Sequence, residues 1–116
     1  MAFRVEVAPR AIRDLDETVE YILESGSPAS AERWFRGIMN EIRLLAEMPA
    51  RCPIAEESES PGLEIRVLVH GRRNRGYKVY FAIDVARRVV QVLHVRHWAR
   101  RPPSASELSE SPRIEE

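Results

Sequence analysis

The sequence predicts an α+β domain with two layers: an N-terminal strand, an antiparallel helix hairpin and a three-stranded antiparallel meander, with all strands in one mixed sheet. This prediction rests on a change in the spacing of apolar residues along the chain. Apolar residues recur every three or four positions between residues 9 and 48, as in amphipathic helices, and every second position between residues 63 and 95, as in strands. The 116 residues are enough for one core and too few for two.

The first predicted elements are a short strand and an amphipathic helix. Residues 3–7, FRVEV, alternate apolar and charged side chains, which is typical of a strand with one buried face. Pro9 has the backbone angle favoured in a first helical turn, and Gly26 suits the left-handed end of a helix. Between them lies an apolar stripe formed by Ile12, Leu15, Val19 and Ile22.

A second helix is expected directly after the first. Ser27 and Pro28 form a cap and first-turn pair, and Met48-Pro49 ends the helix. So short a connection predicts an antiparallel hairpin. The apolar stripe of this helix comprises Ala31, Trp34, Phe35, Ile38, Met39, Ile42 and Leu45. Residues 50–62, ARCPIAEESESPG, have no helical or strand period and are predicted to form a loop.

Three strands and a tail complete the chain. The strands are predicted at residues 63–70, 77–84 and 89–95, joined by the turns HGRRNRG and DVARR, and their short connections favour an antiparallel meander. The tail has too few apolar residues to offset the entropy of ordering it. We therefore expect one domain over residues 1–101 and a flexible acidic tail over residues 102–116.

The charges are separated along the chain although the formal net charge is zero. Residues 1–62 hold 7 Lys and Arg against 12 Asp and Glu, residues 63–101 hold 10 against 2, and residues 102–116 hold 1 against 4. The basic second half suits an anionic partner, because binding responds to the local field.

Several classes of protein are disfavoured by composition. No stretch approaches the roughly 20 apolar residues of a membrane span, and the first residues lack a signal pattern, so we expect a cytoplasmic protein with no membrane partner. The single Cys52 allows no internal disulfide and no cysteine-rich zinc site. The sequence also lacks a nucleotide-binding glycine pattern, and we expect no cofactor and no metal.

A basic surface is predicted on the sheet. One apolar stripe, expected to pack on the helices, consists of Ile65, Val79 and Phe81. Strand alternation then places Arg66, Lys78 and Tyr80 on the opposite face. The alternative is an ordinary solvated face with turn arginines. The full candidate surface for phosphate or another target comprises Arg66, Arg72, Arg73, Arg75, Lys78, Tyr80, Arg96 and Arg100.

Two histidines near this surface are candidates for proton transfer. His94 and His97 are the side chains there that titrate near neutral pH. They have opposite parity on the last strand, so one of them is expected to be a packed structural histidine. Metal binding is disfavoured because no carboxylate or thiolate ligand lies nearby in sequence. Trp98 is expected to cover the edge of the core, with stacking on RNA as the alternative.

Three segments, RCPIAEE, EIRVLVHGRRNRGYKVYFAID and VLHVRHWARRP, resemble the RelE/ParE superfamily of bacterial type II toxins, often labelled plasmid stabilisation proteins. The similarity extends from about residue 3 to residue 102. Its most specific part is a strand ending in Arg-His-Gly-Ala-Arg-Arg, which matches residues 96–101 except that Trp98 replaces the glycine. The resemblance implies a toxin silenced by a cognate antitoxin, with operator DNA bound only through that antitoxin.

The resemblance allows two toxic activities, inhibition of DNA gyrase or cleavage of messenger RNA on the ribosome. For a ribonuclease it implies catalytic Arg66, Lys78 and Arg100, with His97 as a substitute proton carrier. Glu64 stands where that branch has a lysine, and the expected C-terminal tyrosine is missing. These departures favour a ParE-like gyrase inhibitor. The alternatives are a RelE-like ribosome-dependent mRNA endoribonuclease and a non-toxic antitoxin-binding module.

Overall fold

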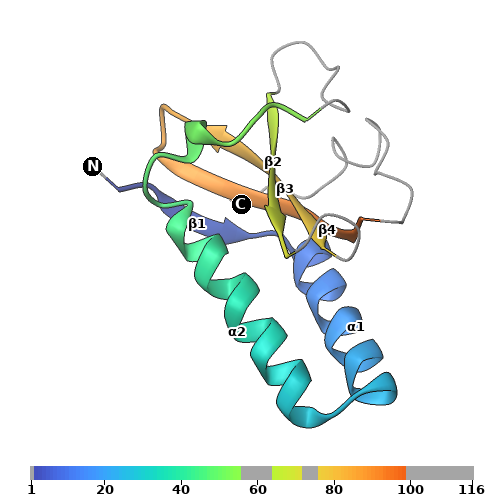
Figure 1. Ribbon diagram of the computed structural model, residues 1–116. Helices are drawn as coiled ribbons and strands as arrows, with labels where there is room; N and C mark the ends of the chain where they lie inside the picture. Colours follow the sequence, from blue (N-terminus) through green and yellow to red (C-terminus); the bar gives the residue numbers. More distant parts are fainter. Residues whose placement is uncertain (1, 56–63, 72–75, 99–116) are drawn as a thin grey trace.

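The structure of the protein is a computed structural model that describes residues 2–55, 64–71 and 76–98 (Figure 1). The predicted tail, part of the loop at residues 50–62 and the basic tip of the first hairpin turn lie outside these residues. The described elements are, in order, β1 (Arg4–Val7), α1 (Pro9–Ser25), α2 (Pro28–Leu44), a 3₁₀ turn η1 (Pro49–Arg51), β2 (Ile65–His70), β3 (Tyr77–Asp84) and β4 (Val89–His97).

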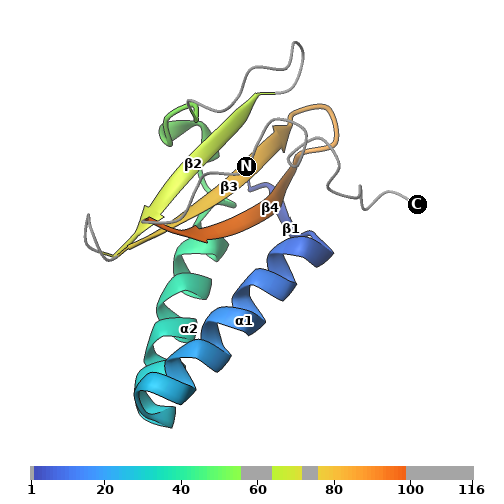
Figure 2. The same ribbon diagram turned by 90° about the vertical axis from the view of Figure 1, so that its right-hand side faces the viewer.

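The strands form one mixed sheet in the order β1-β4-β3-β2. β1 pairs with β4 in parallel, and the other two pairings are antiparallel. The helices lie side by side against one face of this sheet, and the turn between them lies away from it (Figures 1 and 2). The predicted α+β architecture, with its N-terminal strand, helix hairpin and meander, is therefore confirmed.

The helix hairpin owes its sharp turn to local hydrogen bonds. The backbone N–H of Gly26 donates to the carbonyl of Ile22 at the end of α1. The side chain of Ser27 accepts a hydrogen bond from the backbone N–H of Ser30 (3.1 Å), and Ser30 in turn accepts one from the backbone N–H of Ser27 (3.0 Å). This reciprocal cap satisfies donors that a helix start leaves unpaired.

The main core lies between the helices and the sheet. It joins α1 and α2 to one face of the strands, which we call the helix face, and its buried members include Leu15, Ile38, Ile42, Leu68, Val79, Phe81, Val92 and Val95. A smaller cluster lies on the opposite, distal face and consists of Ala55, Ile65, Tyr80 and Leu93, with Val67 and Ala82 packed against it. Both faces of the sheet therefore bury apolar side chains.

Residues after α2 cover the outer edge of β2. The backbone N–H of Val67 donates to the carbonyl of Pro53 (3.0 Å), and that of Ala55 donates to the carbonyl of Ile65 (2.7 Å). The start of the predicted loop is thus a 3₁₀ turn followed by a strand-like contact. Pairing of this kind protects an edge that would otherwise expose unsatisfied backbone groups.

A buried carboxylate connects α1 to β4 where β1 has ended. The Oδ2 atom of Asp14 accepts a hydrogen bond from the backbone N–H of Val95 (2.9 Å), and its Oδ1 atom lies 3.0 Å from the Nε atom of Arg10. β1 reaches only as far as the pairing of Val7 with Val92. Asp14 therefore satisfies a backbone donor on β4 beyond the point where strand pairing stops.

Candidate target-binding face

The distal face carries several of the predicted target-binding residues. Lys78 pairs with Arg96, and Tyr80 pairs with His94, across β3 and β4. Directly paired residues of antiparallel strands project to the same face. Because Tyr80 belongs to the distal cluster, the predicted placement of Lys78 and Tyr80 away from the helices is confirmed.

The predicted placement of Arg66 beside them is wrong. Arg66 pairs with Phe81, whose side chain is buried in the main core, so Arg66 projects toward the helix face. Ile65, expected to pack on the helices, belongs instead to the distal cluster with Tyr80. The alternation within β2 was predicted correctly, but its two sides were exchanged, because both sides carry apolar residues.

The Arg66 guanidinium is tied to the segment that follows α2. Its Nη1 atom donates to the carbonyls of Ala50 (3.2 Å) and Cys52 (2.5 Å), and its Nη2 atom lies 3.6 Å from the Glu64 carboxylate. Hydrogen bonds from a charged donor to backbone carbonyls stabilise a turn. In this chain Arg66 therefore holds η1 against β2.

Lys78 is placed by an aromatic contact. Its Nζ atom lies 4.6 Å from the centre of the Trp98 ring, and the backbone N–H of Trp98 donates to the carbonyl of Gly76 (2.8 Å). An ammonium group over an indole face is attracted by the electrons of the ring. Trp98 therefore orients a cation of the distal face, a role not predicted for it.

The other distal polar residues are buried. The exposed fractions are 1% for Tyr80, 1% for His94 and 5% for Arg96. The Nδ1 atom of His94 lies 3.9 Å from the Asp14 carboxylate. His94 is thus the packed structural histidine that the strand parity predicts.

His97 lies on the other side of the sheet from Lys78. It pairs with Tyr77, and the two rings meet edge to face with centres 5.0 Å apart. The ring of Tyr77 also lies 5.0 Å from that of Trp34 on α2. Burial and the nearby Tyr21 raise the pKa of the Tyr77 hydroxyl above its ordinary value. His97 and Lys78 therefore cannot act on one substrate atom from these positions.

The structure also places Cys52, the single cysteine of the sequence. Cys52 is buried, and desolvation raises the pKa of its thiol, although Arg51 and Arg66 oppose that rise.

Among the described residues, no group of three or more His, Cys, Asp or Glu side chains could hold a metal ion. None of the described helices is long and apolar enough to cross a membrane. The predicted site residues Arg72, Arg73, Arg75 and Arg100 lie outside the described residues.

One feature of the molecule was missed by the sequence reasoning. A cavity lies between α1 and the sheet, lined by Asp14, Glu17, Thr18, Tyr21, Tyr77, Val95 and His97. A signal for it exists in the sequence, because Asp14, Thr18 and Tyr21 follow Ala11 at helical spacing. This places polar side chains in line with the buried side of α1.

A family model described as the ParE toxin of type II toxin-antitoxin system, parDE, matches residues 5–102 of this chain. The match includes all described helices and strands apart from the first residue of β1. Among curated proteins, no sequence matches the chain.

Solved structures share the fold. The chromosomal ParDE toxin-antitoxin system of P. aeruginosa matches with 19% identity and a TM-score of 0.66, covering 83% of this chain and 96% of that one. A free arginine-to-alanine mutant of E. coli toxin RelE matches with 17% identity and a TM-score of 0.53 over 96% and 95% of the two chains. The RelBE2 toxin-antitoxin complex of Mycobacterium tuberculosis matches with 22% identity and a TM-score of 0.54 over 86% and 95%. At these identities the likeness concerns the fold.

Proposed function

Because the chain belongs to the ParE toxin family of type II toxin-antitoxin systems, we propose that it inhibits DNA gyrase and is held inactive by a cognate antitoxin. The family match supports the antitoxin as partner, since it spans residues 5–102 and its description names the paired parDE system. For gyrase inhibition the support comes from this chain's own residues: Glu64 in place of a lysine and the orientation of Arg66. The antitoxin is the partner through which the chain would reach operator DNA.

The orientation of Arg66 is the observation that favours gyrase inhibition over RNA cleavage. A ribonuclease of this fold would need its cations around one phosphate, because they must stabilise charge that develops on that group. Arg66 and Lys78 lie on opposite faces of the sheet, and Arg66 is already bonded to the carbonyls of Ala50 and Cys52. A toxin that acts by binding a protein needs no such cluster.

The distal face is the surface that we propose for target binding. Lys78 is only partly buried there, and Trp98 holds its ammonium group in place. A fixed cation beside an aromatic ring suits a protein target, since aromatic and basic residues carry much of the energy at interfaces. Tyr80 and Arg96, both buried, would support this surface from below.

Supercoiling of relaxed plasmid by purified gyrase tests the proposal. We expect the wild-type protein to inhibit supercoiling and Lys78→Gln to weaken that inhibition about fivefold. A loss of this size is within the range that one partly exposed charge contributes to binding. Arg33→Gln on the exposed side of α2 is the matched control, because it also removes one positive charge, and it should inhibit as the wild type does. Normal supercoiling at saturating wild-type protein would contradict the proposal.

Arg66→Gln separates the proposal from the ribonuclease alternative. The change removes the bonds to Ala50 and Cys52, so we expect the free energy of unfolding to fall by about 1–2 kcal/mol. At a temperature where the variant remains folded, inhibition of gyrase should match that of the wild type. Mapped message ends after induction in cells should show no new cuts with either protein.

Two outcomes would favour the alternatives instead. New message ends that appear with the wild type and disappear with folded Arg66→Gln would assign Arg66 to RNA cleavage. Unimpaired growth on expression without an antitoxin would indicate a binding module without toxicity.

A further inference from the structure

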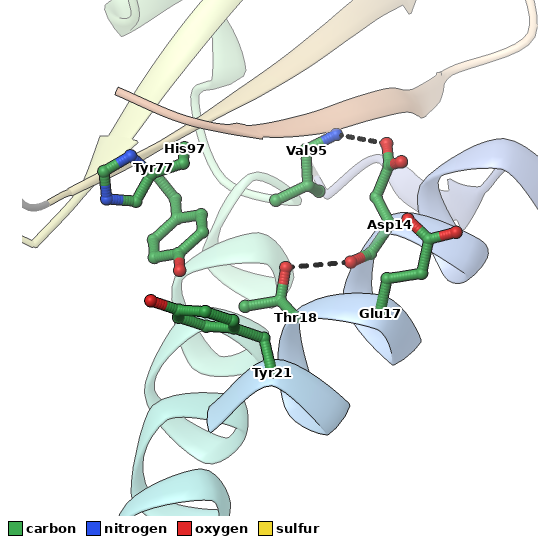
Figure 3. A pocket seen from close by; sticks show the side chains of 7 residues that line it. All are labelled: Asp14, Glu17, Thr18, Tyr21, Tyr77, Val95 and His97. Atoms are coloured by element: carbon green, nitrogen blue, oxygen red, sulfur yellow. Dashed lines mark hydrogen bonds between the residues drawn. The ribbon is translucent and has the colours of Figure 1, made fainter. Parts of the chain in front are cut away.

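The cavity between α1 and the sheet has walls of two kinds. Its volume is about 320 Å³, and it lies where β3 begins and β4 ends (Figure 3). Carboxylates of α1 form one wall, and aromatic rings from α1 and the strands form the other (Figure 3). We call it the Tyr77 pocket; its lining residues are Asp14, Glu17, Thr18, Tyr21, Tyr77, Val95 and His97.

The two carboxylates differ in the hydrogen bonds and ion pairs that they make. Asp14 is buried and already bound on both oxygens, by Arg10 and by the backbone N–H of Val95. Glu17 is exposed, and among the residues that the structure describes it makes no hydrogen bond or ion pair, even with Arg13 one turn before it. The pocket therefore holds one negative charge that no described group neutralises.

One tyrosine of the aromatic wall is packed between other rings and the other is exposed. Tyr77 is held between the rings of Trp34 and His97. Tyr21 comes from α1 and is 64% exposed, and the two tyrosine hydroxyls point toward one another on the aromatic side of the pocket (Figure 3). Two phenol rings beside a carboxylate offer both aromatic faces and hydrogen-bond acceptors to a bound group.

We propose that the Tyr77 pocket binds the guanidinium of an arginine side chain carried by a protein partner. A guanidinium is planar, always charged, stacks on aromatic rings and donates two parallel hydrogen bonds to a carboxylate. Phosphates and other anions are disfavoured, because Glu17 and Asp14 would repel them.

The size and charge of the pocket favour a side chain over a larger ligand. Its volume lies near the lower end of small-molecule pockets, roughly 300–1,000 Å³. The open side at Tyr21 leaves room for the backbone that carries the arginine. This assignment does not depend on gyrase as the target, so it can be tested independently of the proposed function.

The direct test is an NMR titration of the ¹⁵N-labelled full chain with N-acetyl-L-arginine amide. N-acetyl-L-citrulline amide, which has nearly the same shape without the charge, is the matched probe. We expect the arginine probe to shift the backbone amides of Thr18, Val95 and His97, and the citrulline probe to bind about fivefold more weakly or not measurably.

Variants of the pocket should change this affinity without changing the fold. Glu17→Gln should weaken arginine binding about fivefold, and Tyr77→Phe should weaken it to a smaller extent, because the ring is kept. Glu24→Gln lies on the same helix outside the pocket and should bind as the wild type does. Unchanged amide spectra away from the pocket show that each variant is folded.

Several results would overturn the proposal. Equal binding of the arginine and citrulline probes, or equal affinity of Glu17→Gln and the wild type, would exclude a guanidinium site. Shifts at Thr18 and Val95 on replacing Arg100 and Arg101 with glutamine, without any probe, would show that the chain's own arginines occupy the pocket. A dimer in sedimentation experiments that Glu17→Gln dissociates would assign the pocket to a second copy.

Discussion

At the scale of single residues, Asp14 makes the polar contact that we expect to contribute most to the stability of the fold. It is buried, and it connects α1 to the backbone of β4. Asp14→Ala should lower the free energy of unfolding by about 2 kcal/mol, because the N–H of Val95 loses its acceptor inside the protein. Asp16→Ala, an exposed neighbour, should change it by less than about 0.5 kcal/mol. Urea denaturation measures both, and equal losses would contradict the assigned role.

The Cys52 thiol predicts a pH dependence of stability. Burial raises its pKa above the ordinary value of 9.0. Well below pH 9 the thiol is protonated in both the folded and unfolded states. As the pH rises through 9, the unfolded state releases its proton first, so stability falls until the folded thiol also ionises.

Cys52→Ala isolates this contribution. The free energy of unfolding of the wild type should decline between pH 8 and pH 10 more steeply than that of the variant, since the unfolded thiol ionises near pH 9. Parallel curves measured by urea denaturation would show that burial does not shift the thiol.

At the scale of elements, the start of α2 depends on its cap. Ser27→Ala removes the acceptor for the Ser30 backbone N–H and should cost about 1 kcal/mol of stability. Ser25→Ala, at an exposed position whose hydroxyl donates to the carbonyl of Tyr21, should cost less, because that bond lies in solvent. Thermal unfolding of the two variants compares these costs. A larger loss for Ser25→Ala would argue against the cap as the main constraint on the hairpin.

The elements could be predicted from the sequence because their hydrophobic periods are clear. The end of α1 at Gly26, the start of α2 at Ser27-Pro28 and the turn after β3 follow from local spacing and turn chemistry. α2 ends at Leu44, before the predicted Met48-Pro49, and Gly26 has a φ of −141° in place of the expected left-handed conformation. The side of β2 that meets the helices could not be predicted this way, because Ile65 and Leu68 offer apolar residues to both faces. Only the register with β3, which joins Arg66 to Phe81, decides it.

The candidate site was predictable where one strand determines it and not where several elements meet. Lys78 and Tyr80 share a face by strand alternation alone. The Tyr77 pocket needs α1, β3 and β4 in their final arrangement, so no sequence spacing brings Glu17 to Tyr77. A shift of register between β3 and β4 at Tyr80 and Phe81 also changes which residues of β4 face the core.

At the scale of the whole molecule, the two inner strands should be the most stable part. β3 and β4 are each paired on both sides, whereas β1 lies at one edge of the sheet. Amides of Val79, Phe81 and Val92 should therefore exchange with solvent only on global unfolding, and amides of β1 should exchange faster by local opening. Hydrogen exchange followed by NMR measures this. Equal protection of β1 and β4 would mean that the sheet opens as one unit.

The position of β4 has a consequence for how the protein is made. β4 comes last among the described strands, yet it separates β1 from β3 and donates the hydrogen bond from Val95 to Asp14. While the chain is still being synthesised, β1, α1 and α2 are made before β4, the strand that connects β1 to β3 in the sheet. The finished face with Lys78 and Trp98 cannot form until synthesis has passed residue 98, so a half-made toxin cannot present it.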